Sequence, residues 1–267
     1  MAFSAVDIAL WDIKAKAVGE PLWHLLGGSA GKSIEAYNTD CGWLNLSKGK
    51  LVDGCRRMIE EEGFSAVKMK VGKPDPKEDL ERIEAVRSAI GSKVRLMVDA
   101  NAKWDLPTAI QYGSRLADFD VTWFEEPLWH DDVRGHAKLA KAIDTPIALG
   151  ELLYNRHQFL EFATAEAVHY LQPDASRCGG ITGLWEIADL GLVHNIPVSP
   201  HHGDMMQAQL HAVIAHSGCE QLEFIPWTLH CFEEPVCVKD GRYRMPEQPG
   251  AGTTITPDCF EKYGISL

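Results

Sequence analysis

The sequence lacks the features of several large protein classes. No apolar run reaches the roughly 18 residues that a membrane helix needs, and the N-terminus has no basic region followed by an apolar core, as a signal peptide would. No Lys/Arg-dense stretch offsets the formal charge of −12, so we expect neither a nucleic-acid nor a membrane partner. No G-x-G-x-x-G follows the first predicted strand, so an open dinucleotide-binding sheet lacks its fingerprint.

Paired cysteine motifs are also missing. The seven cysteines are odd in number and scattered, with no C-x-x-C pair among them. This pattern favours free thiols in a reducing cytoplasm and argues against a zinc site. The composition is otherwise that of a globular protein, with 45% hydrophobic and 24% charged residues, and 267 residues suffice for one large domain or two small ones.

The chain does contain a regular alternation of strand and helix patterns. Short apolar runs predict eight buried strands, at 34–38, 66–71, 94–98, 121–124, 147–149, 169–172, 197–200 and 221–225. Amphipathic segments between them predict helices at 51–62, 76–90, 106–116, 133–142, 156–164, 181–194 and 205–216. Eight α/β units of about 25 residues favour a closed barrel over an open doubly wound sheet.

The two ends of the chain depart from this alternation. Residues 1–33 contain a predicted helix at 3–18 and a linker into the barrel, which occupies residues 34–228. Residues 229–267 form an irregular C-terminal extension with one hairpin around Asp240 and Gly241. Because an isolated hairpin is marginally stable, we expect this extension to pack against another part of the protein.

Three of the predicted strands end in a carboxylate. Asp99, Glu125 and Glu151 follow the third, fourth and fifth strands, and the carboxyl ends of barrel strands share one rim. Each acid taken alone is more often a helix cap or a surface ion pair. Together, three convergent carboxylates repel one another unless a cation lies between them. The sequence therefore predicts a metal site at this rim.

Most of the other predicted strand ends also carry ionisable groups. The two lysines of the second strand lie on one face of a buried strand, where a solvated charged surface is less expected. A purely structural explanation would not place a titratable group at nearly every strand end, so the set indicates a functional cavity. These further groups are Lys68, Lys70, Asp174, His201 and Glu223.

These motifs resemble the barrel domain of the enolase superfamily, in its mandelate racemase/muconate-lactonising branch. The resemblance covers almost the whole chain and implies a modified TIM barrel of the (β/α)7β type. It also implies an N-terminal capping domain of about a hundred residues, which we expect to be absent here and on which residues 229–267 would normally pack. The matching segments are Lys68-Met69-Lys70, Val98-Asp99-Ala100-Asn101, Phe124-Glu125-Glu126-Pro127, Gly150-Glu151, Gln172-Pro173-Asp174, Cys178-Gly179-Gly180-Ile181-Thr182-Gly183 and Pro197-Val198-Ser199-Pro200-His201.

The resemblance implies a role for each strand-end group. Lys70 would be one acid/base, with its pKa lowered by the neighbouring cation of Lys68, and His201 would be the other, held in one tautomer by Asp174. Glu223 would have to be protonated to donate to a substrate carboxylate. The ligands of Mg²⁺ would be Asp99, Glu125 and Glu151. The residues that bind or polarise the substrate would be Lys68, Asn101 and Glu223.

The implied reaction is Mg²⁺-dependent removal of a proton α to a carboxylate. We expect a carbon–oxygen hydro-lyase that converts an acid sugar into a 2-keto-3-deoxy acid, because the turn Pro200-His201-His202-Gly203 resembles the sugar-acid dehydratases. Two alternatives stay open. One is a racemase or epimerase of a 2-hydroxy acid, and the other is a truncated barrel without a lid, weakly active or inactive, that acts as a binding module. We also expect a cytoplasmic homo-oligomer. The sequence does not specify the sugar or its stereochemistry.

Overall fold

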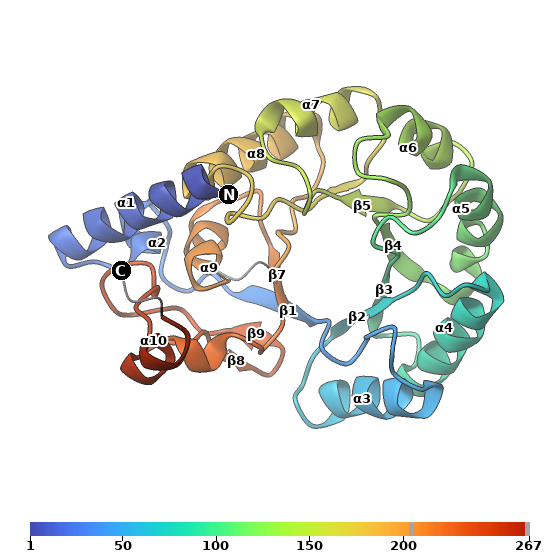
Figure 1. The fold of residues 1–267 in the computed structure, drawn as a ribbon, viewed down its shortest axis with the longest axis horizontal. Coiled ribbons are helices and arrows are strands. Elements are labelled where there is room, and N and C mark those ends of the chain that lie inside the picture. Colours follow the sequence, from blue (N-terminus) through green and yellow to red (C-terminus); the bar gives the residue numbers. More distant parts are fainter. Residues whose placement is uncertain (203–205, 265–267) are drawn as a thin grey trace.

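The computed structural model describes residues 1–202 and 206–264. Parallel strands surround a central axis, and helices form an outer layer around them (Figure 1). The strands of this layer are β1 (Ile34–Asn38), β2 (Ala66–Lys70), β3 (Arg95–Asp99), β4 (Val121–Glu125), β5 (Ile147–Leu149), β6 (Tyr170–Leu171) and β7 (Gln221–Phe224). The helices are α3 (Lys48–Glu60), α4 (Pro76–Ile90), α5 (Leu106–Gly113), the 3-10 turn η1 (Leu116–Phe119), α6 (Val133–Ala140), α7 (Arg156–Thr164), α8 (Gly180–His194) and α9 (Met206–Ala215).

The sheet has the strand order of a modified TIM barrel. Strands β6 to β1 are hydrogen-bonded in sequence order, and β7 pairs parallel with β1. The strand predicted at 197–200 is reduced to single bridges from Val198 to Leu171 and to Cys219, so the regular ladder is interrupted there. Pro197 and Pro200 explain the difference, because neither has an N–H group to donate to a neighbouring strand. Gly203 of the predicted turn and Met205 of the predicted helix lie outside the described residues.

Alternate residues of the strands face opposite sides, as the two-residue period of a strand requires. In β2, Val67 and Met69 belong to the large apolar core shared with the helices, whereas Lys68 and Lys70 face the barrel axis among polar groups. Residues that alternate with the large core form a small separate core, which consists of Tyr37, Ala66, Met97, Trp123 and Ala148. Lys68 Nζ lies 5.6 Å from the centre of the Tyr37 ring, so the polar site borders this apolar cluster.

Five of the outer helices begin at side-chain caps. The cap residue of each helix accepts a hydrogen bond from a backbone N–H in the first turn, which satisfies a donor that the helix itself leaves free. Three of the caps are carboxylates, Asp75, Asp105 and Asp132. They bind the N-termini of helices on the outside of the barrel and are not part of the site on its axis. The remaining caps are Ser47 and Asn155.

The N-terminal segment lies on the outside of the barrel. Helix α1 (Ala2–Val18) runs beside α8 (Figure 1), where Asp7 accepts a 2.6 Å hydrogen bond from the Thr182 hydroxyl. The short helix α2 (Leu22–Leu25) packs against α9. Across residues 1–202 and 206–264, none of the helices combines the length and the apolar character required to span a bilayer.

The C-terminal extension contains the predicted hairpin, and its partner is the barrel itself. Strand β8 (Val238–Lys239) pairs with β9 (Arg242–Tyr243), and β9 pairs antiparallel with β1. The Tyr243 hydroxyl donates a 2.6 Å hydrogen bond to the Glu223 carbonyl of β7. The turn η2 (Leu229–Cys231) and the helix α10 (Pro257–Tyr263) complete the extension; the sequence patterns did not predict α10. Packing of this extension on a capping domain stays a prediction.

Candidate metal and acid–base site

The candidate residues converge at the carboxyl ends of β2 to β5. Parallel pairing places Lys70 opposite Asp99 and Asp99 opposite Glu125, so these ends lie at one level of the sheet. Glu151 follows β5 directly after Gly150, whose φ of 145° favours glycine. A Cβ atom on Gly150 would lie 2.9 Å from the backbone of Gln172. Glycine therefore allows the chain to turn Glu151 towards the axis.

The three predicted metal ligands come together. One oxygen of each carboxylate of Asp99, Glu125 and Glu151 lies within 4.8 Å of the other two. Asp99 and Glu125 are fully buried, and the Glu151 side chain is 12% exposed. Mg²⁺ binds oxygen at about 2.1 Å, so its ligands lie up to about 4.2 Å apart. Small side-chain rotations would therefore bring the three acids to one ion.

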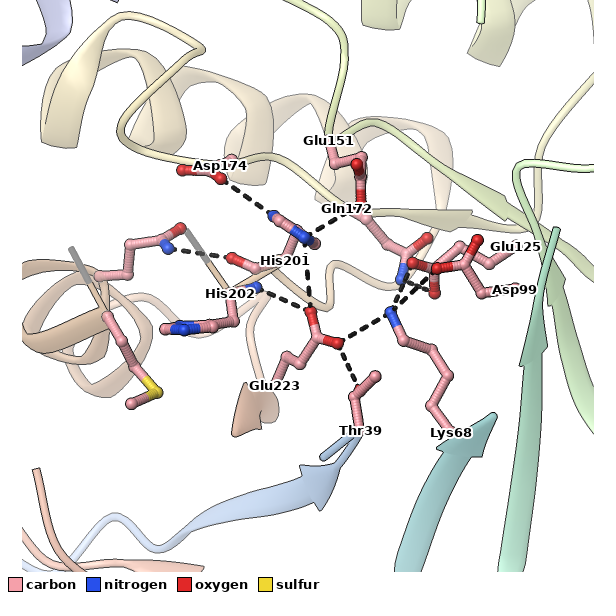
Figure 2. A network of polar contacts seen from close by, with 12 residues as sticks. Thr39, Lys68, Asp99, Glu125, Glu151, Gln172, Asp174, His201, His202 and Glu223 are labelled. Carbon is pink, nitrogen blue, oxygen red and sulfur yellow. Dashed lines mark hydrogen bonds and ion pairs between the residues drawn. The ribbon is translucent and has the colours of Figure 1, made fainter. Parts of the chain in front are cut away.

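Lys68 lies at the centre of the cluster and is fully buried. Its Nζ is 2.5 Å from Glu125 Oε1, 2.9 Å from Glu223 Oε1 and 3.7 Å from Asp99 Oδ2 (Figure 2). Burial disfavours the ammonium form, but Glu125 and Glu223 outweigh it and hold the pKa of Lys68 well above its ordinary value. Lys68 is therefore a permanent positive charge that neutralises acids of the site.

Lys70 differs from the sequence-based expectation of a lowered pKa. Burial and the Lys68 cation do act in that direction, but Lys70 forms an ion pair with Asp99, and the pKa of Lys70 is raised. The prediction left out this pairing, which depends on the register between β2 and β3. A cation bound to Asp99 would compete with Lys70 for the same carboxylate.

His201 stands across the cluster from Lys70, between two acids. Its Nδ1 lies 2.9 Å from Asp174 Oδ2, and its Nε2 lies 3.0 Å from Glu151 Oε2 (Figure 2). Burial disfavours the imidazolium form, but Glu151 and Asp174 outweigh it and raise the pKa of His201 well above its ordinary value. The contact with Asp174 is the one expected from sequence, and it fixes the orientation of the ring.

The pKa of Glu223 is lowered by Lys68 and His201, which is opposite to the protonated state that donation to a substrate carboxylate would require. Burial favours the protonated form, but Lys68 and His201 outweigh it and lower the pKa of Glu223. The carboxylate also accepts hydrogen bonds from the Thr39 hydroxyl and from the backbone N–H of His202. Glu223 therefore acts in this structure as the partner of two cations.

Asn101 lies at the rim, outside the ion-pair cluster. Its side chain is exposed, and its backbone N–H donates a 2.8 Å hydrogen bond to Asp99 Oδ1. Its φ of 43° belongs to the left-handed region, which asparagine adopts more readily than most residues. The structure thus brings Asn101 close to the predicted metal ligands, and its role towards a substrate stays a prediction.

Three polar residues of the site were not identified as such from the sequence. Gln172 Nε2 donates a 2.7 Å hydrogen bond to Glu125 Oε2, which holds that carboxylate in place. Arg177 lies 3.5 Å from Glu151 and 3.6 Å from Asp174. Gln172 stands two residues before Asp174, so the strand-end pattern could have indicated it; Arg177 lies in a loop, where no periodicity points to it.

Glu126 is the third such residue, and its side chain is buried. Within the described part of the chain, neither of its carboxylate oxygens has a hydrogen-bond partner. Burial and the neighbouring acids Glu151 and Asp99 raise the pKa of Glu126 to about 9, so it holds its proton at neutral pH. The strand period would turn Glu126 away from Glu125, but its φ of 38° breaks that alternation.

The cluster has more acidic than basic groups, even with the neutral Glu126 left aside. A cation bound by the carboxylate oxygens would offset this excess of negative charge. Burial raises the pKa of Glu125 to about 7, and Asp99 and Glu223 add to this effect, whereas Lys68 opposes it. The acidic groups are Asp99, Glu125, Glu126, Glu151, Asp174 and Glu223; the basic groups are Lys68, Lys70, Arg177 and His201.

Comparison with known proteins gives relatives over nearly the whole chain. It is 40% identical over 255 residues to the L-talarate/galactarate dehydratase of Salmonella typhimurium, a match that covers 96% of this chain and 63% of the relative. It is 36% identical over 265 residues to the 3,6-anhydro-alpha-L-galactonate cycloisomerase of Streptomyces coelicolor, covering 98% of this chain and 71% of that enzyme. The chain thus spans less than two thirds of the first of these proteins.

A solved structure has the same architecture. The L-talarate dehydratase from Polaromonas sp. JS666, complexed with Mg and L-glucarate, superposes with a TM-score of 0.89 at 39% identity. The match covers 97% of this chain and 69% of that one. The fold class predicted from the sequence, a modified TIM barrel, is therefore confirmed.

Two family profiles match the chain. Residues 1–27 match the mandelate racemase/muconate lactonizing enzyme N-terminal domain, and residues 50–259 match the enolase C-terminal domain-like family. The second match includes each predicted metal ligand and both predicted acid/base residues. The chain accordingly belongs to the enolase C-terminal domain-like family.

Proposed function

We propose that this chain forms the barrel of a Mg²⁺-dependent hydro-lyase, which removes a proton α to a carboxylate and dehydrates an acid sugar to a 2-keto-3-deoxy acid. The observation that carries the proposal is the arrangement of three buried carboxylates between a lysine and a histidine. Lys70 contacts Asp99 at one side of the acids, and His201 contacts Glu151 at the other.

In this proposal Asp99, Glu125 and Glu151 hold Mg²⁺, an ion that prefers oxygen ligands and leaves coordination positions for substrate oxygens. Bound Mg²⁺ supplies positive charge that stabilises the negative oxygens formed when the α-proton leaves. Lys68 adds a buried positive charge to the same region. Gln172 orients one metal ligand through its hydrogen bond to Glu125.

Lys70 and His201 exchange protons with the two faces of the substrate. The base must first be neutral, which requires that it give up the proton that its acidic neighbours hold on it in this structure. The neutral group then takes the proton from C2, and the electron pair of the C–H bond moves into the carboxylate. The electron pair then returns and breaks the C3–O bond, while the opposite group donates a proton, so that the hydroxyl departs as water. The resulting enol becomes the 2-keto-3-deoxy acid by proton transfer to C3. Asp174 keeps the His201 ring oriented throughout.

Relatives support a sugar-acid substrate. The Salmonella relative is named for dehydration of talarate and galactarate, and the Polaromonas structure contains L-glucarate. Such a substrate offers a carboxylate for the cation and hydroxyl groups for the rim residues, among which we place Asn101. A cytoplasmic location and a homo-oligomeric state stay predictions.

A racemase or epimerase is the second candidate, and the opposed placement of Lys70 and His201 favours it. If the second group returns a proton to C2 instead of protonating a leaving hydroxyl, the configuration is inverted. A solved structure from Streptomyces coelicolor, 36% identical to this chain, is named as a racemase with bound magnesium. The two candidates differ in a single measurable respect, since only dehydration releases water and forms a keto acid.

The test is a screen of hexonates and hexarates with the purified chain and Mg²⁺. The keto product is trapped as a semicarbazone, and C2–H exchange is followed by NMR in D₂O. Lys70→Ala and His201→Asn should each lower turnover by about 10³-fold. Exposed residues of the same types provide matched controls in Lys93→Ala and His157→Asn. Turnover that survives both site substitutions contradicts the mechanism. Exchange without keto acid favours the epimerase, and binding of Mg²⁺ and substrate without exchange favours a binding module.

A further inference from the structure

We propose a second metal site in the C-terminal extension, formed by His230, Cys231 and Cys259, which takes a thiophilic cation of the Zn²⁺ class. The three residues come from η2 and α10, outside the ring of strands (Figure 1). Within the described residues, they form a cluster separate from the three acids of the barrel. The site is independent of the proposed reaction.

The donor atoms are close enough to share one ion. One nitrogen of His230 and the two sulfur atoms lie within 4.8 Å of one another, and His230 Nε2 is 3.5 Å from Cys231 Sγ. Zinc binds sulfur at about 2.3 Å and imidazole nitrogen at about 2.0 Å in tetrahedral geometry, so its ligand atoms lie roughly 3.5–3.8 Å apart. The cluster therefore needs only small rotations of its side chains.

The backbone already holds the two cysteines together. Phe232 and Ile255 form an antiparallel bridge, and the Thr256 N–H donates a 2.9 Å hydrogen bond to the Cys231 carbonyl. The Thr256 side chain caps α10 by accepting a hydrogen bond from the Cys259 N–H. These contacts hold η2 close to α10 without an ion. Metal binding therefore requires less additional ordering of the two segments, which favours it.

The donor set selects a soft cation over Mg²⁺. Two thiolates and one neutral imidazole give a charge of −2, which a divalent ion neutralises, and sulfur ligands favour zinc over hard cations. All seven cysteines are free, so both thiols are available. Cys259 is buried, Cys231 is half-buried and His230 is exposed, so an ion can enter from the solvent at His230. Three protein ligands leave a fourth position for water or an external ligand.

The absence of C-x-x-C spacing explains why the sequence argued against zinc. Most structural zinc sites place pairs of ligands close together in the chain, whereas here Cys231 and Cys259 belong to separate elements that only the tertiary structure joins. The ion would link η2 to α10 and so fasten the end of the extension.

The probe is Cd²⁺, which gives an ultraviolet charge-transfer band only when thiolates bind it. The full chain, kept reduced with a phosphine, should show the band at one equivalent, and Zn²⁺ but not excess Mg²⁺ should remove it. Cys231→Ser and Cys259→Ser should lose the band. Cys237→Ser, an exposed cysteine of the same extension, should keep it. His230→Ala should weaken Cd²⁺ binding at least about tenfold.

His230→Ala keeps the test valid even if a cysteine substitution disturbs folding, because this side chain is exposed. Absence of a thiolate band in the folded, reduced chain overturns the proposal. An unchanged band in both Cys231→Ser and Cys259→Ser overturns it as well, and so does an unchanged affinity in His230→Ala. Since none of these readouts depends on turnover, the failure of the proposed dehydratase activity would leave this test unaffected.

Discussion

On β2, β3 and β4, the side chains that face the helices differ sharply from those that face the barrel axis. Val67, Val98 and Phe124 lie in the apolar core between the sheet and the helices. Their immediate neighbours Lys68, Asp99 and Glu125 form the buried ion pairs of the site. These side chains are buried on both faces, but apolar packing stabilises one face and ion pairs stabilise the other. The following predictions test whether the two faces can be changed independently.

The largest effect is expected on the axial face, from loss of an acid/base group. Lys70→Ala and His201→Asn should each lower the dehydration rate by about 10³-fold, within the range that general acid–base groups contribute. Both variants should stay folded, because Lys70 lies at the end of β2 and His201 in the segment after the Val198 bridges, and neither belongs to the apolar core. Steady-state assays of 2-keto acid formation measure the effect. A loss below tenfold in either variant would contradict the assigned role.

On the outer face, Phe124→Ala should destabilise the protein by about 3–5 kcal/mol. Phe124 is fully buried, and its ring packs edge-on against Trp104, 5.1 Å between centroids. Urea denaturation with and without Mg²⁺ measures the loss. Because the cavity lies on the helix side, Mg²⁺ should stabilise Phe124→Ala and the unmodified chain equally, so the difference in stability between them should not change. A difference that shrinks when the ion is added would mean that the faces are coupled.

Lys68→Met should also destabilise the metal-free protein, by about 3 kcal/mol, because it leaves Glu125 and Glu223 as uncompensated buried charges. Unlike the loss at Phe124, part of this loss should be recovered by Mg²⁺, which supplies the missing positive charge. Parallel urea titrations of the two variants provide the comparison. Equal responses to Mg²⁺ would show that the ion does not bind near Lys68.

Mg²⁺ should stabilise the unmodified chain by about 2.7 kcal/mol at a hundredfold excess over its Kd. Removal of the ion with EDTA should reverse the effect. Glu125→Gln combined with Glu151→Gln removes two of the three predicted ligands and should abolish it, as followed by thermal unfolding and by calorimetric titration. Undiminished binding in the double variant would rule out the acids as ligands.

The smallest effect concerns Glu126. Its pKa is raised from 4.5 to about 9, so between these values the folded state holds a proton that the unfolded state has released. Stability therefore falls as the pH rises through this window. Glu126→Gln removes this dependence. The free energy of unfolding of the variant, relative to that of the unmodified chain, should therefore rise by roughly 1 kcal/mol per pH unit.

Denaturation of both proteins in EDTA at about pH 6 and about pH 7 checks this prediction, with the exposed Glu166→Gln as the matched control for the same chemical change. A constant difference between Glu126→Gln and the unmodified chain would show that Glu126 is ionised in the folded state.

Much of the barrel was predictable from local pattern. The helices at 76–90 and 156–164 occur with the predicted bounds, and each has a side-chain cap at its start. The strand at 197–200 failed because apolar composition alone does not reveal that two prolines limit its hydrogen bonding. Helix α10 was missed because seven residues give too short a period to detect.

For the candidate site, the sequence predicted which residues meet but not their charge states. Strand-end position was sufficient to find Asp99, Glu125 and Glu151, and the structure brings them together. It was insufficient for charge states: Glu223 was expected to be protonated, but Lys68 and His201 lower its pKa. A pKa depends on every charge within several ångströms, and sequence order does not give those distances.

The sequence by itself determined which residues lie at strand ends and which face each takes, because both follow from the two-residue period of a strand and from the parallel order of the units. Only the tertiary structure decided which cation pairs with which acid, and that buried Glu126 has no hydrogen-bond partner among residues 1–202 and 206–264. The register between strands and the meeting of η2 with α10 set these contacts. Such distances arise from the packing of segments far apart in the chain, which no local pattern encodes.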